Sequence, residues 1–260
     1  MFYTKIFGIL NITPDSFSDG GAYIDANAAL KRVQELIEQG ADVIDIGAES
    51  TRPGAKALHY EQEIQRLENI LPAASKIAKK FNKQISLDSR NYLTIKRFIN
   101  DIDVINDVTG GADFDIVSLA VLHQKLLVFM HSLSVPVVKG QNINTVDIVR
   151  YLRKWQVQKV GQLKGAGLKD WQLIFDPGIG FGKTAAQCYT IIEQVKRLKL
   201  PEIKMLIGHS RKSFMNQQGH VMSVEEKDQM TLQISKKLIQ SEAVDYLRVH
   251  EVLQTKRILL

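Results

Sequence analysis

Polar side chains that could do chemistry gather in three short stretches of the chain. The stretches cover residues 6–21, 44–54 and 206–213, and each begins as an apolar run that breaks into glycine, proline and hydrogen-bonding side chains. A folded core does not need such clusters, whereas a rigid scaffold presents its binding and catalytic residues on loops of this kind. The three stretches therefore indicate an active site.

Other apolar runs also end in polar residues, so that eight runs in all carry candidate site residues. In chain order these are Asn11, then Glu49 to Arg52, Asp88 to Arg90, Asn106 with Asp107, His131, Asp176, His209 to Lys212, and Arg248 with His250. Any one of them could cap a helix, since Asp, Asn and Ser are favoured at helix N-termini. In a closed barrel all eight positions would instead surround one mouth, where barrel enzymes keep their active sites.

Asp88 and Asp176 are the candidate buried carboxylates. A carboxylate at the end of a buried strand must be hydrogen-bonded or charge-paired. Together with Asn106, the two could hold the edge of an aminopyrimidinone-type ring, which offers adjacent donors and acceptors. The alternative for either residue is a structural carboxylate bonded to loop amides.

A second set of residues has the opposite chemistry. Asn11, Arg52, Arg248 and His250 offer cations and an amide that suit an anion or a metal-bound phosphate. For His250 the alternative is a neutral histidine that is hydrogen-bonded in the barrel wall. The chain has no His, Cys or acidic cluster with zinc-ligand spacing, while a hydrated magnesium held by one oxygen leaves little trace in a sequence.

Residues 176–184 form a glycine-rich stretch that ends like a phosphate-binding P-loop, in Gly182, Lys183 and Thr184. The opening glycine of that motif is missing, because position 177 is proline, and Lys183 stands where a dinucleotide fingerprint has its last glycine. We interpret the stretch as a glycine-rich wall that permits close approach to a flat ligand, with the P-loop as the alternative.

The elements that must position these residues are short apolar strands separated by helical patterns. The predicted strands are 5–10, 43–46, 84–87, 104–105, 126–130, 172–175, 205–207 and 246–249. Alternating strands and helices without hairpin signals indicate parallel pairing with crossover helices. We expect an α/β fold of the TIM-barrel, (β/α)8 type with the active site at the C-terminal ends of the strands; an open doubly wound sheet is the alternative.

Helix boundaries follow from periodicity and capping residues. Apolar residues at helical spacing from Ile64 to Ala78 predict one amphipathic helix, and another is expected to begin at an N-cap near Thr145. Gly40 should end the helix before the second strand, and the polar, glycine-containing segment 132–144 is expected to be a mobile loop.

Length and composition set the broad class. The 260 residues are 45% apolar and 24% charged, which is ordinary for a globular protein, and we expect one domain over 1–260. The net charge of +6 reads as a lysine-rich surface or as attraction for anionic small molecules, and its scatter argues against nucleic acid. No apolar run near the ~18 residues of a membrane span occurs. A single cysteine and no signal-peptide pattern predict a cytoplasmic protein.

Five blocks in order resemble the dihydropteroate synthase family of folate biosynthesis, and the resemblance covers nearly the whole chain. The blocks are GILNITPDSFSDGG at 8–21, ESTRPG at 49–54, DPGIGFGK at 176–183, SRKS at 210–213 and RVH at 248–250. The resemblance implies a (β/α)8 barrel that joins 4-aminobenzoate to 6-hydroxymethyl-7,8-dihydropterin diphosphate and releases pyrophosphate. It also implies a homodimer that binds these small molecules and Mg²⁺.

The resemblance assigns roles to individual positions. The pterin diphosphate would be bound by Thr51, Asp88, Asn106, Met130, Asp176, Lys212, Arg248 and His250, of which Asp88, Lys212, Arg248 and His250 would be catalytic. The aminobenzoate would be bound by Phe17, Thr51, Arg52, Pro53, Phe181 and Ser210. Asn11 would ligate the magnesium ion.

The chain departs from the family pattern at several places. Residues 132–134 replace a usual glutamine-glycine segment, 214–216 lack a usual glycine, Glu251 stands for a common aspartate, and 226–231 lack a small-residue pattern. The departures near His131 keep open a barrel that binds pterin without catalysis. A pterin-binding methyltransferase domain that serves a corrinoid also stays open, because it would share the barrel and the carboxylate-asparagine pterin site. The retained blocks at 49–54 and 210–213 favour the synthase over the methyltransferase, and the intact Asn11, Arg52, Lys212 and His250 argue against the non-catalytic barrel.

Overall fold

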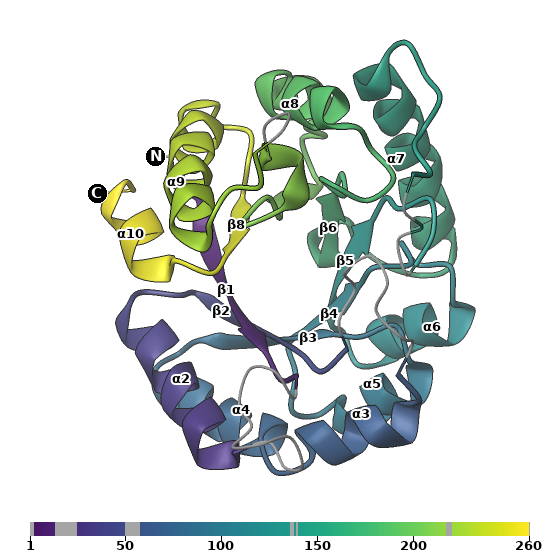
Figure 1. The fold of residues 1–260 in the computed structure, drawn as a ribbon. Coiled ribbons are helices and arrows are strands. Elements are labelled where there is room, and N and C mark those ends of the chain that lie inside the picture. Colours follow the sequence, from purple (N-terminus) through teal and green to yellow (C-terminus); the bar gives the residue numbers. More distant parts are fainter. Residues whose placement is uncertain are drawn as a thin grey trace.

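The computed structural model is a closed barrel of eight parallel strands surrounded by helices (Figure 1). It describes residues 3–13, 25–49, 58–135, 138, 140–216 and 220–259. The strands are β1 (Lys5–Asn11), β2 (Val43–Gly47), β3 (Gln84–Asp88), β4 (Val104–Asp107), β5 (Leu126–Met130), β6 (Leu173–Asp176), β7 (Lys204–Ile207) and β8 (Tyr246–Val249). Each strand pairs with the next, and β8 closes onto β1. The predicted TIM barrel is confirmed, and the open doubly wound sheet is wrong.

The helices lie outside the strands, as crossover connections of a parallel barrel require (Figure 1). They are α2 (Ala26–Glu38), α3 (Tyr60–Leu67), α4 (Leu71–Lys80), α5 (Tyr92–Phe98), α6 (Phe114–Leu122), α7 (Ile148–Gly165), α8 (Ala185–Glu193), α9 (Val224–Gln240) and α10 (Val252–Arg257). In the described residues, three short 3₁₀ turns join or follow them: η1 (Asp170–Gln172), η2 (Val195–Leu198) and η3 (Ser213–Met215).

The single helix predicted from Ile64 to Ala78 is two helices, α3 and α4. Pro72 lies in the first turn of α4, where its missing N–H costs nothing, whereas inside a continuous helix it would remove a hydrogen bond and clash. The apolar spacing continues across the break because both helices contribute buried residues to the same core cluster, so periodicity alone does not reveal the proline boundary.

The predicted N-cap at Thr145 is also wrong. The cap of α7 is Asp147, whose side chain accepts from the backbone N–H of Arg150 at 2.9 Å. The predicted helix end at Gly40 is confirmed: α2 stops at Glu38, and Gly40 has a φ of +97°, a left-handed conformation that glycine adopts freely.

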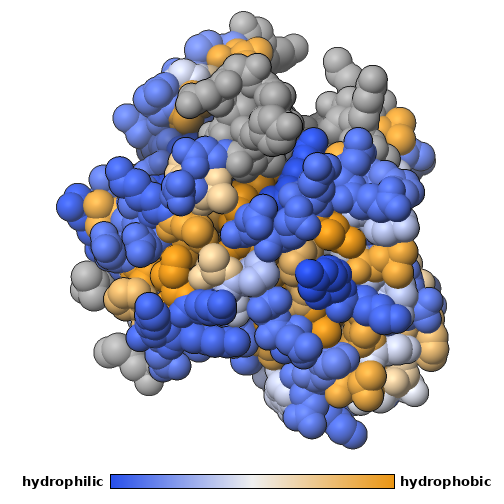
Figure 2. All heavy atoms as spheres, turned by 90° about the horizontal axis from the view of Figure 1, so that it is seen from below, coloured by the Kyte–Doolittle hydropathy of each residue, from blue (hydrophilic) through white to orange (hydrophobic). Residues whose placement is uncertain are grey.

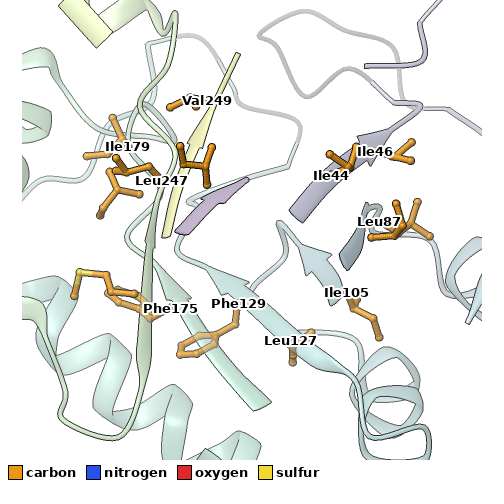
Figure 3. Close-up of a cluster of buried hydrophobic side chains, with 14 of the residues drawn as sticks. Ile44, Ile46, Leu87, Ile105, Leu127, Phe129, Phe175, Ile179, Leu247 and Val249 are labelled. Carbon is orange, nitrogen blue, oxygen red and sulfur yellow. The ribbon is translucent and has the colours of Figure 1, made fainter. Parts of the chain in front are cut away.

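Strand alternation divides the apolar residues into two cores. One set faces the barrel interior and fills the part that lies away from the C-terminal ends of the strands. Its members are Phe7, Val43, Val104, Val128, Ile174, Leu206 and Tyr246. The alternate residues of the same strands pack with the helices in a second, larger cluster (Figure 3). Its members include Ile44, Ile46, Leu87, Ile105, Leu127, Phe129, Phe175 and Leu247, all of which Figure 3 labels. Complete burial of one such side chain stabilises the fold by roughly 1.5–3 kcal/mol.

The face seen from below the view of Figure 1 is largely hydrophilic, with apolar areas between the hydrophilic ones (Figure 2). Such a surface is ordinary, because polar groups never cover a whole protein. Within the described part of the chain, no helix is both long and apolar enough to cross a membrane.

Candidate active site at the C-terminal mouth of the barrel

Along several strands, the residue that faces the barrel interior is apolar at one position and polar at the next interior position, two residues later. Val43 faces the interior, so Asp45, two residues on, points the same way, and the same step leads from Val104 to Asn106 and from Ile174 to Asp176. The step repeats from Tyr246 to Arg248 in β8. The strands therefore place a polar layer directly on top of the inner apolar core, towards their C-terminal ends.

Strand register aligns several predicted site residues in one row. Asn11 pairs with Gly47, Gly47 with Asp88, and Asp88 with Asn106 across four neighbouring strands. Elsewhere around the barrel, Met130 pairs with Asp176. The structure thus brings the proposed metal ligand and the proposed pterin residues to one level of the mouth.

Asp45 is a central residue of this layer that the sequence reasoning missed. It is 1% exposed and accepts hydrogen bonds from Ser86 Oγ at 2.6 Å, from Asn106 Nδ2 at 3.2 and 3.3 Å, and from Arg248 Nε. The sequence signal is a carboxylate inside the apolar run of residues 43–46. A pattern based on the residues that end each strand does not include it.

Arg248 lies between Asp45 and Asp88. Its Nη2 donates to Asp88 Oδ2 at 2.5 Å, while its Nε donates to Asp45. Burial opposes the charge on the guanidinium, but the two carboxylates outweigh it and raise the pKa of Arg248 above its ordinary value. Because two carboxylates share one cation, the group carries a net negative charge when both are ionised.

The same arrangement acts on Asp88. Burial raises the pKa of Asp88 to about 7; Arg248 opposes this rise, and the nearby charge of Asp45 adds to it. With this pKa, the carboxyl group of Asp88 gains or loses its proton near neutral pH. Shifted pKa values of this kind are common at functional sites.

Asn106 is oriented by the carboxylate below it. Its Nδ2 donates to both oxygens of Asp45, which fixes the side-chain amide. Toward the described residues, the amide carbonyl oxygen makes no hydrogen bond, so it stays an acceptor that faces the mouth beside Asp88.

Asp176 and Lys212 attract each other electrostatically on the other side of the mouth. Asp176 Oδ1 accepts from the backbone N–H of Gly178 at 2.7 Å, and burial raises the pKa of Asp176 while Lys212 opposes the rise. Burial lowers the pKa of Lys212 to about 8, against the attraction of Asp176. Lys212 Nζ donates to Ile179 O at 2.6 Å and lies 4.6 Å from the centre of the Phe181 ring.

Ser210 and His250 meet at the adjacent edge. Ser210 Oγ lies 2.9 Å from His250 Nδ1 and accepts from the His250 backbone N–H at 3.3 Å. The resemblance assigned the two residues to different substrates; the structure brings them into direct contact.

Several other strand-end residues are structural. Glu49 accepts two hydrogen bonds from Arg90, at 2.8 and 2.9 Å, and Asp107 accepts from the backbone N–H groups of Thr109 and Gly111. His209 is fully buried, with its Nε2 3.1 Å from Thr231 O. These polar groups bond to neighbouring segments of the protein.

The P-loop alternative is wrong because Lys183 points into the protein. Its Nζ is buried and donates to Gly178 O at 2.9 Å, Phe181 O at 3.0 Å and His131 O at 3.2 Å. Thr184 is the N-cap of α8. The ammonium group therefore holds the glycine-rich loop against the end of β5 and is not directed at a phosphate. Burial lowers its pKa to about 7.

The glycines of this loop make room for the protein's own chain. A Cβ on Gly178, which has a φ of +69°, would lie 2.0 Å from His131 O, and one on Gly182 would lie 2.8 Å from Leu133. We predicted that these glycines let a flat ligand approach the backbone closely. The structure shows that they are already needed for the loop after β6 to pack on the loop after β5. Whether a ligand also uses it stays a prediction.

Asn11 is compatible with a magnesium ion. The side chain is half-buried and makes no hydrogen bond to the described residues, so its oxygen is available as a ligand. Within the described ranges no group of three or more His, Cys, Asp or Glu could hold a metal. One protein oxygen combined with diphosphate and water oxygens is a set that magnesium accepts. The predicted residues Phe17, Thr51, Arg52 and Pro53 lie outside the described residues.

A family model described as "Pterin binding enzyme" matches residues 7–250. Over 256 residues the chain is 36% identical to a dihydropteroate synthase of Clostridium beijerinckii, which covers 98% of this chain and 91% of the relative. The chain belongs to the dihydropteroate synthase family of pterin-binding enzymes.

Solved structures of the dihydropteroate synthase family have the same fold. The enzyme from Anaplasma phagocytophilum with bound 6-hydroxymethylpterin-monophosphate has a TM-score of 0.89 and 33% identity, over 99% of this chain and 97% of that chain. The Xanthomonas albilineans synthase with 4-aminobenzoic acid has a TM-score of 0.87 and 29% identity, over 99% and 91%. Some relatives are longer: this chain spans 58% of three folate synthesis bifunctional proteins from Chlamydia species.

Proposed function

We propose that the chain is a dihydropteroate synthase, which condenses 6-hydroxymethyl-7,8-dihydropterin diphosphate with 4-aminobenzoate to give 7,8-dihydropteroate and pyrophosphate in folate biosynthesis. One observation carries the proposal: Asp88, Asn106 and Asp176 converge on the barrel mouth beside the cations Lys212 and Arg248. A pterin bearing a diphosphate needs both kinds of group, since its ring edge presents N–H donors and its tail presents negative charge.

The pterin ring would be read by the oxygens of Asn106 and Asp176. Asp176 uses one oxygen for Gly178, which leaves the other for ring N–H groups. Met130, which is 4% exposed and pairs with Asp176, would pack beside the ring. Bound 6-hydroxymethylpterin-monophosphate in the Anaplasma phagocytophilum relative supports this class of ligand.

The reaction would break the C–O bond between the pterin methylene and the diphosphate and form a C–N bond to the arylamine, which then loses a proton. As the diphosphate leaves, positive charge develops on the pterin, and the negatively charged group of Asp45, Asp88 and Arg248 can offset it. The arylamine is a weak nucleophile, so holding it at the correct distance and angle matters more than a strong base.

The diphosphate would be bound by Arg248 and His250, while Lys212 would hold the pterin. When bound beside Asn11, magnesium would neutralise part of the charge on the leaving diphosphate. We assign Phe17, Thr51, Arg52, Pro53, Phe181 and Ser210 to the aminobenzoate, with Thr51 also at the pterin diphosphate; 4-aminobenzoic acid in the Xanthomonas albilineans relative supports that class of second substrate.

Three further proposals concern the chain as a whole. We propose a single domain over 1–260 that works as a homodimer in the cytoplasm, which the buried Cys188 suits because a reducing compartment leaves it as a thiol. Analytical ultracentrifugation of the purified chain would show the dimer, and a monomer at all concentrations would contradict it.

The experiment that tests the function is direct. The purified protein is incubated with the pterin diphosphate, labelled 4-aminobenzoate and magnesium, and labelled dihydropteroate and released pyrophosphate are measured together. Equal amounts of the two products are expected. Spectroscopic titration with a methylated corrinoid protein tests the methyltransferase alternative. Pterin binding without either reaction would leave only the non-catalytic barrel.

A further inference from the structure

Arg211 lies between two proposed site residues, Ser210 and Lys212, but its own side chain leads away from them. Its backbone has a φ of +58°, a left-handed conformation that residues other than glycine seldom adopt. This turn lets Ser210 contact His250 and lets Lys212 reach Ile179 O, while the Arg211 side chain reaches α9. A strained residue between two site residues is commonly held in place by its surroundings.

The Arg211 guanidinium joins two segments that are distant in sequence. It donates to both oxygens of Asp228 in α9, at 2.7 and 2.8 Å, and its Nη2 also donates to Glu251 at 2.8 Å. The backbone N–H of Arg211 donates to Thr231 Oγ1 at 3.3 Å. Arg211 is thus anchored on α9 and linked to the residue that directly follows His250.

These contacts continue the register of β7 and β8 beyond the strands themselves. The two strands pair through Leu206 with Tyr246 and Ile207 with Leu247, an offset of 40 residues. The Ser210–His250 and Arg211–Glu251 contacts have the same offset of 40. After backbone pairing stops, two side-chain contacts therefore keep the loops after β7 and β8 aligned residue by residue.

We propose that Arg211 and Glu251 are positioning residues that hold Lys212, on the loop after β7, level with Arg248 and His250, on β8 and its loop. The naming of the ligand rests on the proposed function: a pterin diphosphate needs Lys212 at its ring and Arg248 and His250 at its diphosphate, all at once. Asn106 and Asp176 on the strands still hold the ring when the loops shift, so the alignment should matter for the diphosphate and much less for a bare pterin.

The test compares Glu251→Ala with Asp170→Ala. Both substitutions remove a carboxylate that is 38% exposed and paired at 2.8 Å, but the Asp170 pair with Lys164 lies before β6, far from the mouth. Glu251→Ala should raise the KM for the pterin diphosphate roughly three- to tenfold, in keeping with a partly exposed ion-pair network. Binding of 6-hydroxymethylpterin should change less than about twofold, and Asp170→Ala should alter neither value.

Glu251→Gln supplies a conservative rescue, because its amide oxygen can still accept from Arg211. It should restore most of the loss in KM. Similar KM values for Glu251→Ala and Asp170→Ala would overturn the positioning role, as would equal losses for the diphosphate and the bare pterin.

A second measurement does not depend on activity. Hydrogen–deuterium exchange of the peptide over 208–216 should become faster in Glu251→Ala than in the wild type and in Asp170→Ala. If the wild type makes no dihydropteroate, the proposed function fails, and exchange still decides whether Glu251 holds this loop. Unchanged exchange in Glu251→Ala would overturn the positioning role whatever the activity.

Discussion

Arg248 donates hydrogen bonds to two carboxylates, Asp45 and Asp88, that lie on neighbouring strands. Asp45 is one step deeper in the barrel than Asp88 and also orients Asn106. A single buried aspartate thus sets both the direction of the guanidinium and the direction of the amide. The negative charge of Asp45 also lies close to Asp88 and raises its pKa. Asp45 can therefore affect the protonation of Asp88 without contacting a ligand.

Asp45→Asn should move the acid side of the pH–activity profile to lower pH. The charge of Asp45 helps to raise the pKa of Asp88, which is about 7, so its removal lowers that pKa and Asp88 becomes ionised at more acidic pH. If ionised Asp88 is needed for catalysis, kcat/KM rises with pH through this pKa, and the rise begins earlier in the variant.

The control for this prediction is Ser86→Ala, which removes one hydrogen bond to Asp45 but keeps the charge. Its acid limb should stay in place. An acid limb of Asp45→Asn that is unmoved, or moved to higher pH, would contradict the role of Asp45. In Asp45→Asn, Arg248 still has its hydrogen bond to Asp88. The free energy of unfolding should therefore fall by less than the ~3–5 kcal/mol seen when a buried charge loses its only partner.

Asp88→Asn should damage catalysis far more than folding. The substitution keeps volume and one acceptor but removes charge beside the developing pterin cation, and loss of one such preorganised contact costs about 3 kcal/mol, roughly a hundredfold or more in rate. Single-turnover rate, pterin affinity and melting temperature are the measurements. Near-normal single-turnover chemistry, or loss of the fold, would show that the electrostatic role of Asp88 is wrong.

Asp176→Asn is expected to behave differently, with weaker pterin binding as its main effect. Asp176 accepts from Gly178 with one oxygen, and the amide would place a donor where a ring N–H needs an acceptor. Calorimetry with the bare pterin should show a loss of about tenfold or more. Unchanged pterin affinity would remove Asp176 from the ring site.

Asn11→Ala should mainly lower turnover in saturating substrate and weaken the response to magnesium. Asn11 is the one residue that we assign to the metal, and its oxygen lies level with Asp88 through the register of β1, β2 and β3. The measurement is turnover across a magnesium titration in both proteins. Wild-type turnover that persists in excess chelator would contradict the metal proposal itself.

Gly178→Ala should destabilise the protein by roughly 3 kcal/mol or more. A left-handed alanine costs about 1–2 kcal/mol, and overpacking against the backbone adds about 1–3 kcal/mol; here the new Cβ would lie 2.0 Å from His131 O. Denaturant unfolding measures the loss.

Gly161→Ala is the matched control for that prediction. Gly161 is exposed within α7 and has no neighbour within 4 Å of an added Cβ, so the same chemical change should stabilise by about 0.5–1 kcal/mol. A Gly178→Ala protein as stable as the wild type would show that the loop after β6 can move away from β5.

The strands and most of the candidate site could be predicted from the sequence because both depend on local pattern. Short apolar runs between helical patterns predicted eight parallel strands, and 126–130 and 246–249 have the bounds that the structure shows. Strand ends in a parallel barrel must meet at one mouth, so Asp88, Asn106, Asp176 and Arg248 were expected together, and they lie around it.

Tertiary structure decided which of those polar groups touch. Asp45 and Arg248 are 203 residues apart, and only closure of the barrel brings them into contact. The direction of Lys183 likewise depends on three carbonyl groups, two within its own loop and one at the end of β5, and a sequence motif does not encode that geometry. Periodicity reports which face of an element is buried, whereas hydrogen bonds between distant segments depend on register and on how the loops pack.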